Sequence, residues 1–281
     1  MSLHKSIGTL LSMLLASPFV AADTGGALES GGYLELGTAV YAERSIRVRL
    51  DGEDRRPTDT GAGLYVAGAW RKGRAFVEGR RGGVDGASLG VTLWYDERRT
   101  LELLAAHLPG SVKIGFRVGE DDVGADSDDR DRNAALLGRD QVVGTSGLRY
   151  REYRGDTLLQ ASAVADWQHG NGLLLGLHVG HRWQLGNWNL QGIVGLQGAG
   201  ADLVDYIYGV DEDEATTRFA AYRGEDTLFG EADLKITRAL GRDWVLRSSL
   251  LVRHFGDGIT DSPLVAAADA LSAELGVAYV F

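Results

Sequence analysis

The chain has 281 residues, no cysteine and a formal net charge of -10 at pH 7, with a pI near 5.1. An acidic chain is a poor partner for nucleic acid, because a phosphate backbone attracts a basic surface. The lack of cysteine excludes disulfides, thiolate metal sites and cysteine nucleophiles. Glycine, at 40 residues, is about twice as frequent as usual, which favours tight turns and closely packed backbones in an all-β protein.

The first 22 residues have the pattern of a cleaved signal peptide. Lys5 precedes an apolar run of about 15 residues, which is shorter than the roughly 20 residues of a membrane-spanning helix. Pro18 ends this run, and the small residues Val20 and Ala22 suit the positions before a cleavage site. We expect cleavage between Ala22 and Asp23, which leaves residues 23–281 as a single domain.

From residue 32 onward, apolar residues recur at every second position, which is the period of a β-strand. In residues 172–183 a face of leucine, valine and tryptophan alternates with a face of glycine, histidine and arginine. The predicted strands are about 10 to 13 residues long, close to the roughly 9 to 11 residues that cross a membrane at a tilt. The ranges are 32–41, 62–71, 73–80, 86–95, 99–107, 142–152, 156–167, 172–184, 188–200, 226–238, 242–255 and 271–281.

Connections between these strands alternate between short turns and longer polar loops. Residues 42–61, 108–141, 201–225 and 256–270 are the long ones. This alternation is typical of bacterial outer-membrane barrels, which have short periplasmic turns, long external loops and an even number of strands. We predict an antiparallel transmembrane β-barrel of about 12 strands, within a range of 10 to 14, since residues 111–118 could replace the strand at 99–107 or add a pair.

A soluble barrel is the competing interpretation, with the apolar face turned inward. Three features favour the membrane barrel. Trp183, Trp188 and Trp244 lie at strand ends beside short turns, where an interfacial aromatic girdle is expected. The other face is rich in charge and glycine and would make a poor core, and the connections alternate in length. With twelve strands, both termini of the barrel lie in the periplasm.

The last predicted strand, 271–281, ends with aromatic residues at alternate positions. Glu274, Gly276, Tyr279 and Phe281 have the polar-x-Gly-x-x-aromatic-x-aromatic form of the C-terminal signal that barrel-assembly machinery recognises. Such a strand offers an open edge for β-augmentation, with aromatic side chains at alternate positions for specificity. We expect Tyr279 and Phe281 to face lipid and Glu274 to face the lumen, within reach of Arg247 or Arg253.

In the last three predicted strands, charged residues occupy the alternate positions that point into the lumen. Glu231, Asp233 and Lys235 belong to one strand, and Arg247 and Arg253 belong to the next. Opposite charges on neighbouring strands can pair. A barrel of this size can be closed by such a network or can keep a narrow polar pore; we expect a mostly plugged lumen with little conductance.

Two loops carry a family resemblance. Tyr208, Gly209 and Val210 lie in the loop before the tenth strand, and Gly256, Asp257, Asp261, Ser262 and Pro263 lie before the last strand. In this order, ahead of an aromatic C-terminal strand, these residues resemble the motifs of the MipA/OmpV family of outer-membrane proteins. The resemblance is clear over about 170–281. A Pro-x-Tyr-x-Gly-Ser stretch, expected in the family after the first strand, is replaced by GTAVYAERSIRV.

The resemblance implies a non-enzymatic, monomeric barrel in the outer membrane of a Gram-negative bacterium. The family's named member is a scaffold that brings a lytic murein transglycosylase together with a peptidoglycan synthase, which implies a role in murein synthesis and remodelling. Other members are described as porin-like, so a small-solute channel is the alternative. Lipid, lipopolysaccharide and the barrel-assembly machinery are the remaining expected partners, and we expect no cofactor and no bound metal.

Catalytic patterns are weak by comparison. His254 lies near Asp257 and Asp261 in the sequence, as in barrel proteases, but no paired aspartates accompany it; His178 is expected in the lumen without the serine and asparagine of a phospholipase. HExxH and Walker motifs are absent. Two acidic stretches, residues 120–131 and 211–214, could bind divalent cations, although a solvated acidic loop explains them more simply.

Overall fold

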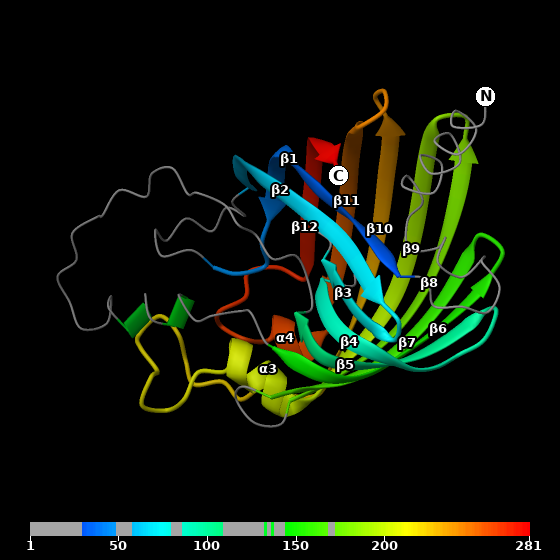
Figure 1. The fold of residues 1–281 in the computed structure, drawn as a ribbon. Helices are drawn as coiled ribbons and strands as arrows, with labels where there is room; N and C mark the ends of the chain where they lie inside the picture. The colour runs from blue at the N-terminus through cyan, green and yellow to red at the C-terminus, as the bar shows by residue number, and fades with distance from the viewer. Residues whose placement is uncertain are drawn as a thin grey trace, which may run out of the picture.

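The computed structural model describes residues 30–48, 58–79, 86–108, 132–133, 136–137, 144–167 and 172–281. In this part of the chain the fold is a closed antiparallel β-barrel of twelve strands, in which each strand pairs with its neighbours in sequence and β1 pairs with β12 (Figure 1). The predicted fold class is confirmed.

All twelve strands predicted from the two-residue period are present, with ends that differ by a few residues. Their bounds are β1 Gly31–Arg44, β2 Thr58–Lys72, β3 Ala75–Gly79, β4 Ala87–Tyr95, β5 Arg99–Leu108, β6 Thr145–Arg154, β7 Thr157–Asp166, β8 Leu173–Leu185, β9 Trp188–Ala199, β10 Thr227–Ala239, β11 Trp244–Phe255 and β12 Asp269–Val280. The strand at 99–107 is therefore real.

The two ends of the barrel differ in the length of their connections. At one end, here called the turn end, the strands are joined by residues 73–74, 96–98, 155–156, 186–187 and 240–243. Gly73, Gly155 and Gly186 have φ near +60°, the left-handed conformation that tight hairpin turns require. At the opposite end, the loop end, lie the longer connections with two short helices, α3 (Ala201–Tyr208) and α4 (Asp257–Thr260) (Figure 1). β1 starts and β12 finishes at the turn end, as predicted.

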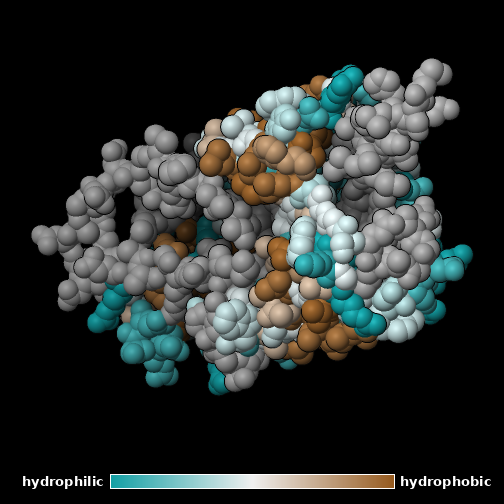
Figure 2. Space-filling view, in the orientation of Figure 1, coloured by the Kyte–Doolittle hydropathy of each residue, from teal (hydrophilic) through white to brown (hydrophobic). Residues whose placement is uncertain are grey.

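The outer face of the wall is mainly apolar in the strands that the structure describes. Leucine and valine side chains at alternate positions, such as Leu177 (62% exposed) and Val194 (59% exposed), point away from the barrel axis. Figure 2 shows hydrophobic residues gathered over the visible wall. Trp183 and Trp244, from the predicted girdle, are about half exposed at the turn end, and Trp70 and Trp94 join them there. A hydrophobic face turned outward suits contact with lipid.

Several sequence predictions concern residues outside the described part of the chain. These are the signal peptide with its cleavage site at Ala22 and Asp23, the alternative strand at 111–118, and the acidic stretch 120–131. Among the helices that the structure does describe, none combines the length and the apolar character needed to cross a membrane.

Candidate functional site

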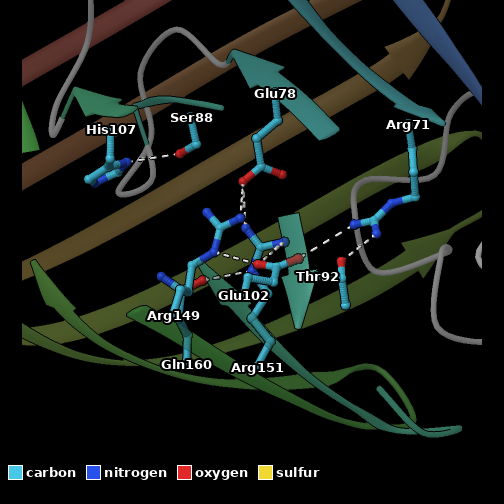
Figure 3. Close-up of polar contacts among 9 residues, drawn as sticks. All are labelled: Arg71, Glu78, Ser88, Thr92, Glu102, His107, Arg149, Arg151 and Gln160. Carbon is cyan, nitrogen blue, oxygen red and sulfur yellow. Dashed lines mark hydrogen bonds and ion pairs between the residues drawn. The ribbon is translucent and has the colours of Figure 1, made fainter. Parts of the chain in front are cut away.

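A cluster of buried charges lies inside the barrel wall of β2–β6 (Figure 3). It consists of Arg71, Glu78, Glu102, Arg149 and Arg151, and we call it the arginine cluster. Glu102 and Arg149 are each only 1% exposed. The alternation of each strand turns all five side chains to the inner face, where the backbone of the wall hides them from lipid.

Arg149 is the centre of the arginine cluster. Its Nε donates to Glu102 Oε2 at 2.8 Å, and its Nη2 pairs with Glu78. Arg151 also donates from Nη2 to Glu78 Oε1, at 2.7 Å. A planar guanidinium holds two carboxylates in fixed directions, which a lysine ammonium does not do. Strands β3, β5 and β6 are thereby tied together across the lumenal face.

The edges of the arginine cluster extend to two more strands. Arg71 donates to Thr92 of β4 at 2.8 Å and lies 3.4 Å from a carboxylate oxygen of Glu102. On the other side, Arg151 Nε donates to Gln160 of β7 at 3.1 Å. The cluster thus connects neighbouring strands from β2 to β7.

A second network is centred on Glu231 of β10. One oxygen, Oε1, lies 2.8 Å from His178 Nε2 of β8 and accepts from Gln197 of β9 at 2.6 Å. The other oxygen accepts from Arg253 Nε of β11 at 3.1 Å. Gly195 makes room for this arrangement, because a Cβ there would lie 2.2 Å from the His178 ring. One carboxylate therefore links four adjacent strands.

The remaining predicted lumenal charges form smaller contacts. Lys235 Nζ lies 3.2 Å from Asp233 Oδ2 on the same strand. Arg247 forms a bidentate pair with Glu35 of β1 and donates to Thr237 at 3.1 Å. Arg247 and Arg253 pair with the carboxylates of Glu35 and Glu231, and the expected contact of Glu274 with one of these arginines stays a prediction. The closing strand β12 lies between β11 and β1, so the Arg247–Glu35 pair reaches across it.

Sequence reasoning placed the lumenal charges only on the last strands and missed the arginine cluster. The signal was available in the alternation of β3, β5 and β6, where Glu78, Glu102, Arg149 and Arg151 all occupy the polar phase. Their mutual pairing could not be read from it, since Arg151 and Glu78 are 73 residues apart. Pairing depends on the register of strands that are distant in sequence.

At the loop end, α3 packs into the mouth of the barrel. Leu203 and Val204 are buried against Leu174, Phe229 and Phe255. These three residues share the inward phase of His178, Glu231 and Arg253, and the two phenylalanine rings stack 5.5 Å apart. Helix α3 therefore covers the inner wall of β8–β11 at this end, directly beyond the Glu231 network.

The two loops with family motifs lie together beside α3. Ser262 Oγ donates to the carbonyl of Tyr208 at 2.7 Å, and Val210 shares a buried cluster with Leu264. Gly209 allows the chain to leave α3, because a Cβ there would lie 2.4 Å from the Asp205 carbonyl oxygen. Gly256 similarly lies against the Leu228 carbonyl. Helix α4 begins at Asp257, Asp261 is its C-cap, and Pro263 follows two residues later. The motif residues build the packing of the loop end.

Arg47 binds these loops to the segment after β1. It is 7% exposed, donates to the carbonyls of Leu137 and Ile207 at 3.2 and 2.6 Å, and stacks over the Tyr208 ring at 5.5 Å. Burial raises the pKa of the Tyr208 hydroxyl, so this ring stays neutral beside the arginine. Sequence reasoning did not single out Arg47, since nothing in its own neighbourhood marks it.

The C-terminal motif residues lie on the outer rim and on the closing seam. Tyr279 packs edge-on against Trp244 and against Phe281, with ring centroids 5.4 and 4.8 Å apart. The Phe281 N–H donates to the Leu34 carbonyl at 2.9 Å, which extends the β1 pairing by one residue. Gly276 faces β1, where an added Cβ would lie 2.9 Å from both Ala39 Cβ and the Thr38 oxygen.

Two further histidines in the described part of the chain each contact one polar side chain. His254 is exposed, and its Nδ1 lies 2.8 Å from Asp269; Asp257 and Asp261, expected near it, belong to α4 and its cap. His107 bonds to Ser88 at 2.9 Å inside the wall. Across the described ranges, no group of three or more histidine, aspartate or glutamate side chains is arranged to hold a metal ion.

Comparison with known proteins adds a family match over nearly the whole chain. A family model described as "MltA-interacting protein MipA" matches residues 26–281. Two relatives named "Putative outer membrane protein YiaT", from Escherichia coli O157:H7 and strain K12, are each 26% identical over 196 residues, covering 69% of this chain and 75% of theirs.

Solved structures with low similarity include two barrels. OmpTdeltaL8, a loop deletion mutant of an outer membrane protein of Vibrio cholerae, is 10% identical, with a TM-score of 0.39 over 90% of this chain and 99% of that one. The anion-selective porin of Comamonas acidovorans is 11% identical, with a TM-score of 0.34 and the same coverage.

Proposed function

Since this chain belongs to the MipA family, and is an outer-membrane β-barrel as its relatives and its fold indicate, we propose that it serves as a non-enzymatic scaffold for murein remodelling. Its partner would be a lytic transglycosylase of the MltA type, with a peptidoglycan synthase as a further member of the assembly. The observation that carries the proposal is the family match over residues 26–281, which includes every strand of the barrel.

The turn end is the surface on which such a partner would dock. In bacterial barrels the short turns face the periplasm, where murein lies. The exposed side chains of these turns and their flanks are mainly charged and more basic than the chain as a whole: Lys72, Arg74, Arg98, Arg154 and Arg242 against Glu97, Asp156 and Asp243. A basic rim on an acidic protein would steer a partner with an acidic face.

The small size of the turns limits the area that they can bury. Stable interfaces bury roughly 1,200–2,000 Å² in total, so the rim of the barrel and residues 23–31 would have to contribute as well. A weak, transient complex is the natural form of such docking. The ionic networks support this function because they keep the wall rigid, which holds the turns in one arrangement.

A small-solute channel is the second candidate, and the charged lumenal face favours it. The position of α3 argues against it, because the helix packs against inward-facing residues of β8, β10 and β11 at the loop end. We therefore place the channel second to the scaffold.

Site-specific photocrosslinking in intact envelopes tests the scaffold. A photoreactive residue at Glu97, Asn187 or Arg242 on the turn end should capture a lytic transglycosylase or a synthase. The matched control places the same residue at Glu212 or Thr217 on the loop end, where the exposed side chains face the cell exterior. No murein enzyme captured from any turn position, or equal capture from the loop positions, would contradict the proposal.

A further inference from the structure

The outer wall near the turn end contains a groove of about 410 Å³ with a polar group on its floor. Val179, Trp183, Val194 and Leu250 line its sides, and Gly192 forms part of its floor. Since the chain is an outer-membrane barrel, this wall is surrounded by lipid. The groove is therefore a site for a membrane component and not for a soluble molecule.

His181 makes this groove unusual for a membrane-facing surface. It pairs in register with Gly192 on one side and Thr157 on the other, in the same outward phase as Val179 and Trp183. Its Nδ1 lies 2.8 Å from Thr157 Oγ1, and its ring packs edge-on against Trp183 at 4.7 Å. An ionisable residue that faces lipid is costly and marks a functional site by default.

A cation without a carboxylate partner lies on the same strands, nearer the turn end. Arg238 of β10 stacks over the Trp188 ring at 4.7 Å, and its Nε is buried with no hydrogen-bond partner. Among the described residues no carboxylate forms an ion pair with it. Gly192, in the floor of the groove, pairs with Leu234 on one side and with His181 on the other, so these three residues lie at the same level. Arg238 is four residues beyond Leu234 and therefore lies about 14 Å along the strand from that level.

Arg99 of β5, on another part of the wall at the turn end, is an arginine whose charge is neutralised. It stacks over Trp94 at 5.5 Å, as Arg238 does over Trp188, but its guanidinium pairs with Asp96 at 2.7 Å. Arg154 is likewise neutralised by Glu152 at 2.8 Å. Of these three outward arginines, Arg238 alone keeps its charge available to an external anion.

We propose that this surface binds one anionic glycerophospholipid of the periplasmic leaflet. Its phosphate is held by Arg238 on Trp188, and one acyl chain lies in the groove over Gly192 and beside His181. From the turn end inward, the cation comes first and the apolar groove follows about 14 Å along the strand, which is the order of phosphate and acyl chain in such a lipid.

Lipid binding measured by native mass spectrometry tests the proposal. The folded full chain in detergent is titrated with dioleoyl phosphatidylglycerol, and the first bound lipid is quantified. Arg238→Gln should weaken this binding about fivefold, as expected for one arginine at a membrane surface. The matched control Arg99→Gln, which removes a neutralised arginine from a tryptophan ring, should leave it unchanged.

A second pair of variants tests the groove independently of charge. Ala232→Leu fills the groove and should weaken the first lipid site, whereas Ala163→Leu, an equally exposed alanine on the outer face of β7, should not. Folding of every variant is checked by heat-modifiable migration in gels. The proposal would be overturned if R238Q and A232L bound the lipid as tightly as the native chain does. It would also be overturned if the controls R99Q and A163L lost as much binding as R238Q and A232L. A third contradicting result would be equal affinity of the native chain for phosphatidylcholine and phosphatidylglycerol.

Discussion

Arg247 of β11 forms a bidentate ion pair with Glu35 of β1, and the pair spans the closing strand β12 between them. The Glu35 side chain is completely buried and the Arg247 side chain is 27% exposed. The barrel is therefore closed by a buried charge pair as well as by the backbone ladder of β1 and β12. Removal of one partner alone leaves the other charge buried in the wall without a counter-charge.

Stability should fall sharply when this pair is broken on one side. We expect Glu35→Met to lower the free energy of unfolding by about 3–5 kcal/mol, because Arg247 then stays buried without its carboxylate. The double variant Glu35→Met with Arg247→Met should recover most of this loss. Urea titration in phospholipid vesicles, followed by tryptophan fluorescence, measures both. Equal losses in the single and double variants would show that the pair itself is not the cause.

Arg149→Lys should also destabilise the barrel, although the charge is kept. A single ammonium cannot reproduce the guanidinium contacts to Glu78 and Glu102, so we expect a loss of about 3 kcal/mol. Arg182→Lys is the matched control, since Arg182 pairs with Asp156 in an exposed turn; there the loss should stay below about 1 kcal/mol. Comparable losses at both positions would refute a special role for the arginine cluster.

The native barrel should conduct poorly in planar bilayers. Helix α3 packs against the inward face of β8–β11, and replacement of residues 201–208 by a glycine-serine linker should raise the single-channel current severalfold. The same replacement at residues 211–214, an exposed acidic stretch of the same loop, is the control and should change little. A large, steady current through the unaltered protein would favour the channel function.

Deletion of Phe281 should reduce the amount of protein in the outer membrane. The deletion removes the ring contact with Tyr279 and the hydrogen bond to the Leu34 carbonyl, which complete the closing edge. Phe281→Trp keeps both and should assemble normally. Fractionation of envelopes with immunoblotting measures the levels, and normal levels after deletion would remove the assembly role of this residue.

Gly276→Val tests the same edge from its inner side. A side chain at this position collides with Ala39 and with the Thr38 oxygen, so β12 could not approach β1 at its present distance. We expect a barrel that folds slowly and unfolds at lower urea concentration. Gly230→Val is a suitable comparison, because a Cβ at Gly230 would meet only the Gly195 oxygen, at 3.9 Å.

The strands of this barrel were predictable because their signal is local. The alternation of apolar and polar residues fixes strand and phase without knowledge of any partner, and β8 and β10 were placed to within about one residue at either end. The strand at 99–107 was harder to place, because β5 carries a register irregularity between Leu104 and His107 that interrupts the alternation.

The sequence identified the motif residues of the loop end but not the contacts between them. The motif residues around Tyr208 and Ser262 could be named, but their contact joins residues 54 apart. Arg47, which ties Leu137 and Ile207 together, lies 90 and 160 residues from them and has no motif of its own. Such contacts depend on how the loops fold over the mouth.

The sequence by itself determined the architecture: which residues form strands, which face of each strand meets lipid, and which end carries the loops. These features follow from a two-residue period and from loop length, which each segment carries alone. The tertiary structure decided the pairings: Arg149 with Glu78 and Glu102, Glu231 with His178, and Arg247 with Glu35. Among the described residues, it left Arg238 without a carboxylate partner at the turn end. Electrostatic partners are set by register and barrel closure, and these are properties of the closed sheet as a whole.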